Sequence, residues 1–139
     1  MNTRKFMDFV VIATGIFLIV LAGGRFLVDP IGGQAAFGIP QVDTDGNLSF
    51  HYIKGIRDVV IGVYILILVY HKHEKLLGWF LFVSGAIAAT DGWVVMGYNG
   101  NGPLHAWMHL TALPICIGGG LFYLFLEQVQ TNQSSSTKK

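Results

Sequence analysis

Residues 6–28 read FMDFVVIATGIFLIVLAGGRFLV, an apolar run in which Asp8 and Arg25 are the only charged residues. A helix needs about 20 such residues to cross the roughly 30 Å of hydrocarbon in a bilayer. Three further apolar runs of similar length follow at 51–70, 76–97 and 103–126. In lipid every backbone amide must be paired internally, and no alternating strand pattern indicates a barrel, so the four runs predict four transmembrane helices.

The composition agrees with an integral membrane protein and excludes several other classes. Of the 139 residues, 53% are hydrophobic and only 12% are charged, which is about half of the ~25% typical of soluble domains. The net charge of +1 gives no electrostatic basis for binding nucleic acid. Cys116 is the single cysteine, which excludes an internal disulfide framework. We therefore expect the lipid bilayer, and not nucleic acid, to be a partner of this chain.

The apolar runs predict an all-α fold, an integral membrane four-helix up-down bundle with a long loop between helices 1 and 2. Residues 1–127 form a single four-span transmembrane domain in this interpretation. The long loop, residues 29–50, contains Gly32-Gly33, Gly38, Pro40 and Asp45-Gly46-Asn47, and we expect successive turns that cover one end of the bundle. Residues 128–139 are polar and rich in serine, and we expect them to be a disordered tail.

Basic residues outside the spans fall on one side of this topology. They precede helix 1, occupy the turn between helices 2 and 3, and end the tail: Arg4, Lys5, Lys72, Lys75, Lys138 and Lys139. The opposite side, residues 29–50 and 98–102, contains no Lys or Arg. Because cytoplasmic loops carry the excess of Lys and Arg, both termini are predicted to be cytoplasmic.

Ionisable residues also enter the spans from the side opposite the termini. Arg57, Asp91 and His109 come from three different helices, and at 1.5 Å per residue each lies about 9 Å inside its helix end. A charge deep in a span costs about 2.5–3.5 kcal/mol, and such residues usually face the bundle interior and pair. Other ionisable residues near this side are Arg25, Lys54 and Asp58. We therefore predict a polar, ion-paired pocket that opens toward the non-cytoplasmic side.

The residue types in this pocket suit both catalysis and simple binding. The candidate acid–base groups, for conversion of a small lipophilic molecule, are Asp91, His105 and Asp58. The candidate ligand contacts are Arg25, Lys54, Arg57 and His109. Asp91 has a second interpretation, which we favour, as the salt-bridge partner of Arg57 or Arg25, because cations of matching depth are available.

The two histidines of the last span raise the question of a metal. His105 and His109 are spaced i, i+4, so on one helix they share a face and could bind a metal with Asp91 or Asp58. No Glu joins them as in the helix motif of zinc proteases. We therefore predict no metal site, and the acid–base chemistry proposed for the pocket needs no cofactor.

Several short motifs resemble those of a family of small membrane proteins, the domain of unknown function 4267. They are Gly24-Arg25 with Asp29-Pro30, the turn Phe37-Gly38-Ile39-Pro40, the run Lys54-Gly55-Ile56-Arg57-Asp58, Asp91 and His105. The run that opens the second span is the most specific of these, and the resemblance covers roughly residues 9–125. It implies no activity, catalytic residue or cofactor. A looser similarity to DoxX-like four-helix membrane proteins rests on architecture alone.

Three functions are compatible with the sequence, and only the first includes an enzyme. The first is binding or conversion of a small lipophilic molecule whose polar end meets the pocket. The second is a non-catalytic accessory or structural membrane protein, in which the polar layer only fixes helix packing. The third is proton-coupled transport. It is less favoured, because the cytoplasmic half of the spans lacks ionisable groups for a relay, and it would require a homo-oligomer.

Overall fold

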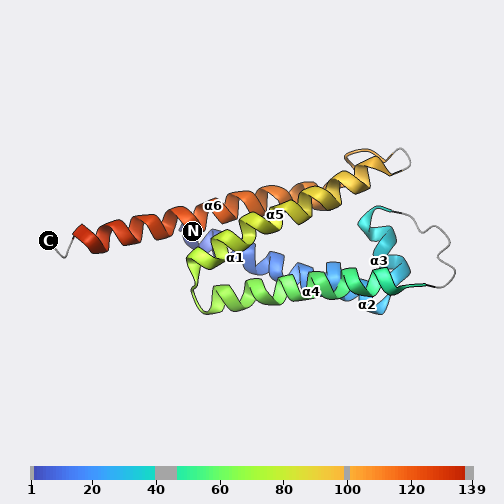
Figure 1. Cartoon of the computed structure of the whole chain (residues 1–139), viewed down its shortest axis with the longest axis horizontal. Coiled ribbons are helices and arrows are strands. Elements are labelled where there is room, and N and C mark those ends of the chain that lie inside the picture. Colours follow the sequence, from blue (N-terminus) through green and yellow to red (C-terminus); the bar gives the residue numbers. More distant parts are fainter. Residues whose placement is uncertain (1, 40–46, 99–100, 137–139) are drawn as a thin grey trace.

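The structure is a computed structural model that describes residues 2–39, 47–98 and 101–136, with side chains as far as residue 126. All regular structure in these ranges is helical (Figure 1), as the apolar runs predict. In chain order the elements are α1 (Thr3–Phe17), η1 (Leu18–Gly23), α2 (Gly24–Val28), α3 (Pro30–Phe37), α4 (Ser49–Tyr70), α5 (Glu74–Gly97) and α6 (Trp107–Ser136).

The first three elements form one continuous helical run that changes from α-helix to π-helix and back. α1 and α2 are α-helical, whereas η1 between them is π-helical. The Gly24 amide donates to the Ile19 carbonyl, five residues earlier, which is the hydrogen bond of a π turn. A π turn shifts the residues that follow around the helix axis, so η1 helps to decide which way the side chains of α2 face.

The long helices pack as two pairs. α4 lies beside the α1–η1–α2 run, and α5 lies beside α6 (Figure 1). The pairs come together near the short turn between α4 and α5 and diverge toward the other end, where α3 lies between them. The fold therefore has a narrow end and a wide end, and the wide end is the one that the sequence predicts to carry the polar pocket.

Glycines bring the helices of each pair close together. A Cβ atom at Gly23 would lie 2.5 Å from the Gly55 carbonyl oxygen, so only glycine lets the first run approach α4 at this point. In the other pair, a Cβ at Gly120 would lie 2.9 Å from the Gly78 carbonyl oxygen. Small residues at such contacts are typical of helix packing in membranes.

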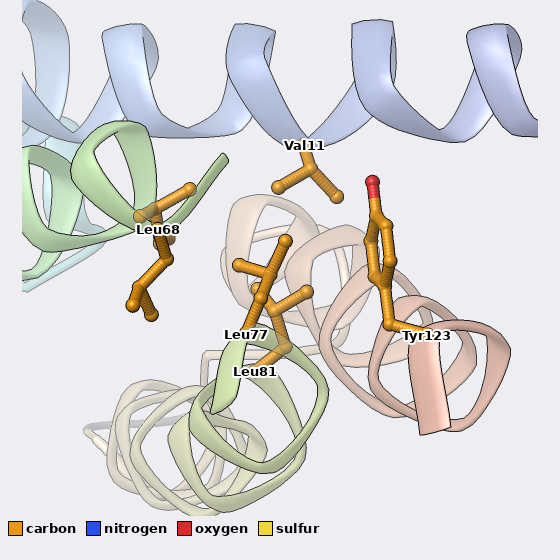
Figure 2. Packing of buried hydrophobic residues seen from close by; sticks show 6 residues of the cluster. Val11, Leu68, Leu77, Leu81 and Tyr123 are labelled. Carbon is orange, nitrogen blue, oxygen red and sulfur yellow. The ribbon is translucent and has the colours of Figure 1, made fainter. Parts of the chain in front are cut away.

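The apolar core lies at the narrow end. Figure 2 shows its residues pointing toward one another from different helices, with Val11, Leu68, Leu77, Leu81 and Tyr123 labelled. The buried cluster consists of Val11, Ile65, Leu68, Leu77, Leu81 and Tyr123. It joins the two helix pairs where they converge, so the wide end is free of this packing.

Three of the four predicted spans are helices long and apolar enough to cross a membrane, namely Thr3–Val28, Glu74–Gly97 and Trp107–Leu126. The fourth predicted span, residues 51–70, coincides with α4. α4 is long enough, but every 18-residue stretch of it contains Lys54, Arg57 and Asp58, whereas each of the other three has such a stretch with at most two charged residues. By length and composition, the described part of the chain thus contains three candidate spans where the sequence predicted four.

Two connecting segments differ from their prediction. The segment after helix 1 was expected to make successive turns, but its first part forms α3, capped by the Asp29 side chain at its start and by Gly38 in the left-handed conformation (φ 99°) at its end. Residues 40–46, in the middle of the predicted loop, lie outside the described residues. Residues 103–106 were expected to open the last span but form consecutive turns, since the Ala106 amide bonds to the Pro103 carbonyl and α6 begins only at Trp107.

The tail also differs. The sequence predicted disorder from residue 128, but in the structure α6 continues to Ser136. The chain contains no Gly or Pro between Leu121 and Ser136 that would end the helix. Residues 137–139 lie outside the described residues. They include Lys138 and Lys139, two of the basic residues from which the cytoplasmic side was predicted.

Candidate functional site

Lys54 is the centre of a cluster of charged side chains at the wide end. Its Nζ lies 2.6 Å from Oδ2 of Asp58, one turn further along α4, and 3.8 Å from Oδ2 of Asp91 on α5. Its side chain is only 7% exposed. An ammonium group this deep needs nearby negative charge, and the two carboxylates supply it.

Arg57 completes the cluster. Its Nη2 donates to Oδ2 of Asp91 at 2.9 Å, and its Nε donates to Oδ1 of Asp58 at 3.1 Å. The guanidinium is 39% exposed, so it closes the cluster on its outer side. Two cations and two carboxylates thus form a network with no net charge that links α4 to α5.

Two aromatic rings also lie close to the Lys54 ammonium. Its Nζ lies 4.3 Å from the ring centroid of Phe37 at the end of α3 and 5.1 Å from that of Phe26 in α2. The two rings meet edge to face, with their centroids 6.2 Å apart. At such distances the negative faces of the rings attract a cation, which adds to the effect of the carboxylates.

α3 and the residue that follows it form hydrogen bonds to both helix pairs at the wide end. On one side, His51 of α4 bonds through Nε2 to the side chain of Gln34. On the other side, Asn101 donates to the Gly38 carbonyl at 2.7 Å. His109 of α6 lies with Nε2 3.4 Å from the Phe37 carbonyl oxygen. α3 therefore lies between the two helix pairs and bonds to both.

A cavity of about 540 Å³ lies between the helices, bordered by the charged cluster and α3. Its polar lining includes Thr14, Arg25, Lys54, Asp58, Ser84, Asp91 and His109. The rest of the lining is largely apolar and comes from α1, η1, α2, α3, α4, α5 and α6, with Leu18, Ile61, Ile65, Ala88 and Cys116 among its residues. This volume and this mixture of many apolar groups with a few polar ones are typical of small-molecule sites.

Most of the predicted site residues meet at the wide end. Lys54, Arg57, Asp58 and Asp91 are joined by ion pairs, and His109 lines the same cavity. Asp91 pairs with Arg57, the first of the two partners that the sequence left open. The second, Arg25, lines the cavity but forms no ion pair with any described residue.

The structure does not bring His105 into this group. His105 is exposed and lies in the turns before α6, and its Nδ1 accepts a hydrogen bond from the Gly102 amide at 3.3 Å. The expected shared face with His109 required a helix through both residues. The turns of residues 103–106 remove that helix. Among the described residues, no group of three His, Cys, Asp or Glu side chains is placed to hold a metal ion.

Two polar features of the structure were not predicted, one in the site and one at the opposite end. The first is the pair of rings around Lys54, for which the sequence gives only a weak signal, since Phe37 belongs to a motif quoted above for its turn. The second is a polar group at the narrow end, where the Tyr123 hydroxyl donates to Asp8 at 2.6 Å and Arg4 pairs with Glu74. Because Asp8 lies within a candidate span, the statement that this half of the spans lacks ionisable groups is wrong.

Comparison with known proteins gives one match. Neither the curated proteins nor the solved structures contain a match to this chain. The family termed domain of unknown function 4267 matches residues 7–123, which include every residue of the charged cluster and of the cavity lining. The resemblance seen in the sequence is thereby confirmed, and the chain belongs to the domain of unknown function 4267 family.

Proposed function

We propose that this protein crosses the membrane four times, as an up-down bundle, and binds a small lipophilic molecule in the cavity between its helices. The 22 residues of α4 extend over about 33 Å at 1.5 Å per residue, which is enough to cross the hydrocarbon. Its charges are balanced within the cluster, so their cost in a membrane is reduced. Ile53, Ile56 and Val60 are exposed on α4, as expected of a helix that faces lipid.

The orientation follows from the basic residues. With four crossings, the end of α1 that carries Arg4 and Lys5 lies on the same side as Lys72 and Lys75 of the α4–α5 turn. The excess of Lys and Arg places this narrow end in the cytoplasm. The wide end, with the cavity and α3, then faces the opposite side of the membrane.

The observation that carries the binding proposal is the cavity itself. It has the volume of a small-molecule site, a largely apolar lining for the body of a ligand, and charged groups for its polar end. Acid–base conversion of the ligand is less well supported than binding. Asp58 and Asp91 both line the cavity, but each already accepts two ion-pair contacts.

A purely structural role is the second candidate, and the neutrality of the cluster favours it. Two cations facing two carboxylates can fix the position of α4 against α5 without any ligand. In that case the cavity is incidental, and filling it would leave the protein unaffected. The two candidates thus differ in what a bulky residue inside the cavity should do.

The test uses two neighbouring alanines of α5. Ala88 lines the cavity and Ala89 is exposed on the outer surface, so Ala88→Phe fills the cavity whereas Ala89→Phe is its matched control. The measurement is equilibrium binding of tritiated 1-dodecanol to the protein in lipid nanodiscs, corrected with empty nanodiscs. We expect one bound molecule per chain in the wild type and in Ala89→Phe, and loss of binding in Ala88→Phe. Equal binding by both variants, or none by the wild type, would refute the proposal.

A further inference from the structure

One of the charged residues that line the cavity is not part of the ion-paired cluster. Arg25, Lys54 and Arg57 are the cations at the wide end, and Asp58 and Asp91 are the carboxylates of the cluster. Lys54 and Arg57 are paired with these two carboxylates, so the cluster is neutral. Arg25 remains, and it has no ion-pair partner among the described residues. Of the four charged residues that line the cavity, Arg25 is therefore the one that takes part in no ion pair among the described residues.

Lys54 and Arg57 are poorly placed to receive a further anion. Lys54 also lines the cavity, but its ammonium already faces carboxylates on α4 and α5 and two aromatic rings. Arg57 uses Nε and Nη2 on the same two carboxylates, and it is not part of the cavity lining. An anion close to either cation would also meet Asp58 and Asp91, which repel it.

Arg25 differs from these two cations because it forms no ion pair with the described residues. Its side chain lines the cavity and is exposed, so it can reach a ligand without first breaking an ion pair. A guanidinium presents paired N–H donors in a plane, a geometry that matches the oxygens of a carboxylate or phosphate. The π turn of η1 lies just before Arg25 and contributes to its direction.

The apolar lining continues from Arg25 toward the core. Ala22, Leu18 and Thr14 line the cavity along the same helical run. Thr14 and Arg25 are eleven residues apart, or about 16 Å at 1.5 Å per residue. An unbranched alkyl chain of about a dozen carbons spans this distance, and the cavity volume of about 540 Å³ suits one such chain rather than a two-chain lipid.

We propose that the ligand is a single-chain amphiphile with an oxyanion head group, which Arg25 binds at the wide end while the alkyl chain extends along η1 and α1 toward Thr14. This inference rests on the proposed function, because it assumes that the cavity is occupied. It assigns the recognition of the head group to the one cation of the cavity lining that has no carboxylate partner among the described residues.

The test compares four probes with the same twelve-carbon chain in the nanodisc assay described above: dodecanoate, dodecyl phosphate, 1-dodecanol and dodecylamine. In the wild type we expect the two anions to bind about tenfold more tightly than the alcohol, and the amine to bind most weakly. Arg25→Gln should bring the anions to the affinity of the alcohol, and Arg25→Lys should keep most of the preference. Lys5→Gln, which removes an exposed cation at the narrow end of the same run, is the control and should change nothing.

The outcomes separate the inference from the function on which it rests. If the wild type binds the alcohol as tightly as the anions, or if the preference survives in Arg25→Gln, the head-group assignment to Arg25 is wrong while cavity binding stands. If the wild type binds none of the four probes, the proposed function itself fails. Binding of 1-dodecanol by Arg25→Gln shows that this variant is folded. A preference for one anion over the other identifies the head group as a carboxylate or a phosphate.

Discussion

Lys54 illustrates how a charged side chain can be buried in this fold when a partner of opposite charge lies beside it. A buried ammonium is costly unless it is paired, and removing one partner of a buried pair is more harmful than removing both. Lys54 has its shortest contact with Asp58, 2.6 Å away in the same helix, and a longer one of 3.8 Å with Asp91. Asp58 is thus the partner on which the burial of Lys54 depends most.

We predict that Asp58→Asn lowers the free energy of unfolding by about 3–5 kcal/mol, because Lys54 then stays buried with a single distant carboxylate. The double variant Lys54→Met/Asp58→Leu should recover most of this loss, because it leaves no buried charge of the pair. The measurement is denaturant unfolding in detergent micelles. Asp29→Asn is the control, since asparagine caps α3 as well as aspartate does. If Asp58→Asn is as stable as this control, Asp58 does not stabilise the buried charge of Lys54.

Among the elements, α3 is the one that connects both helix pairs at the wide end. It is too short to be stable alone, and its position depends on its ends. The Asp29 side chain caps the first turn through the Gly32 amide at 3.0 Å. Gly38 ends the helix with φ 99°, and a Cβ there would lie 2.7 Å from the His105 carbonyl oxygen. Space and backbone conformation both require glycine at this position.

We predict that Gly38→Ala loosens α3 without unfolding the bundle, since the left-handed conformation is strained for alanine and the added methyl group meets the turn before α6. Hydrogen exchange of the α3 amides should be at least about tenfold faster, while amides of the core at the narrow end should stay protected. Gly97→Ala is the matched control, because nothing lies within 4 Å of a Cβ there. Unchanged exchange in α3, or the same increase in Gly97→Ala, would show that Gly38 does not hold this element.

The whole molecule has an apolar core at one end and a charged cluster with a cavity at the other. Large apolar side chains remain exposed along the helices, among them Phe9, Val83 and Phe125. In water such a surface would drive association, whereas in a bilayer it faces lipid. The membrane therefore completes the packing that a chain of this composition lacks.

We predict that α4 crosses the membrane, so that Lys5 and Lys72 lie on the cytoplasmic side and Ala35 and Leu104 on the other. The experiment replaces Cys116 by serine and introduces single cysteines at these four positions for labelling with a membrane-impermeant maleimide in sealed vesicles of known orientation. Three crossings would instead place position 72 with position 35 and position 104 with position 5. That labelling pattern would overturn the four-span topology, and it differs from the expected one at two independent sites.

Sequence reasoning was most accurate where the signal is local. The three helices that could cross a membrane and the i, i+4 pairing of Lys54 with Asp58 were predicted, and the structure contains them. α3 was missed although its signals are present, since Asp29-Pro30 is a helix start and Gly38 a helix end. They were interpreted as turns because the segment is short and rich in glycine. His105 was misplaced because the turn after Pro103 shifts the helix start by four residues.

The sequence by itself determined that the chain is helical, that it suits a membrane and that one end collects charged residues. These properties add up residue by residue along the chain, so they can be read without knowing how the helices meet. Only the tertiary structure decided which partner each charge has: it placed two rings on Lys54, paired Arg57 with Asp91 and left Arg25 in the cavity lining without a described carboxylate. Such contacts join residues that are far apart in the chain, and they depend on how each helix is rotated and how deeply it packs, as the π turn before Arg25 illustrates.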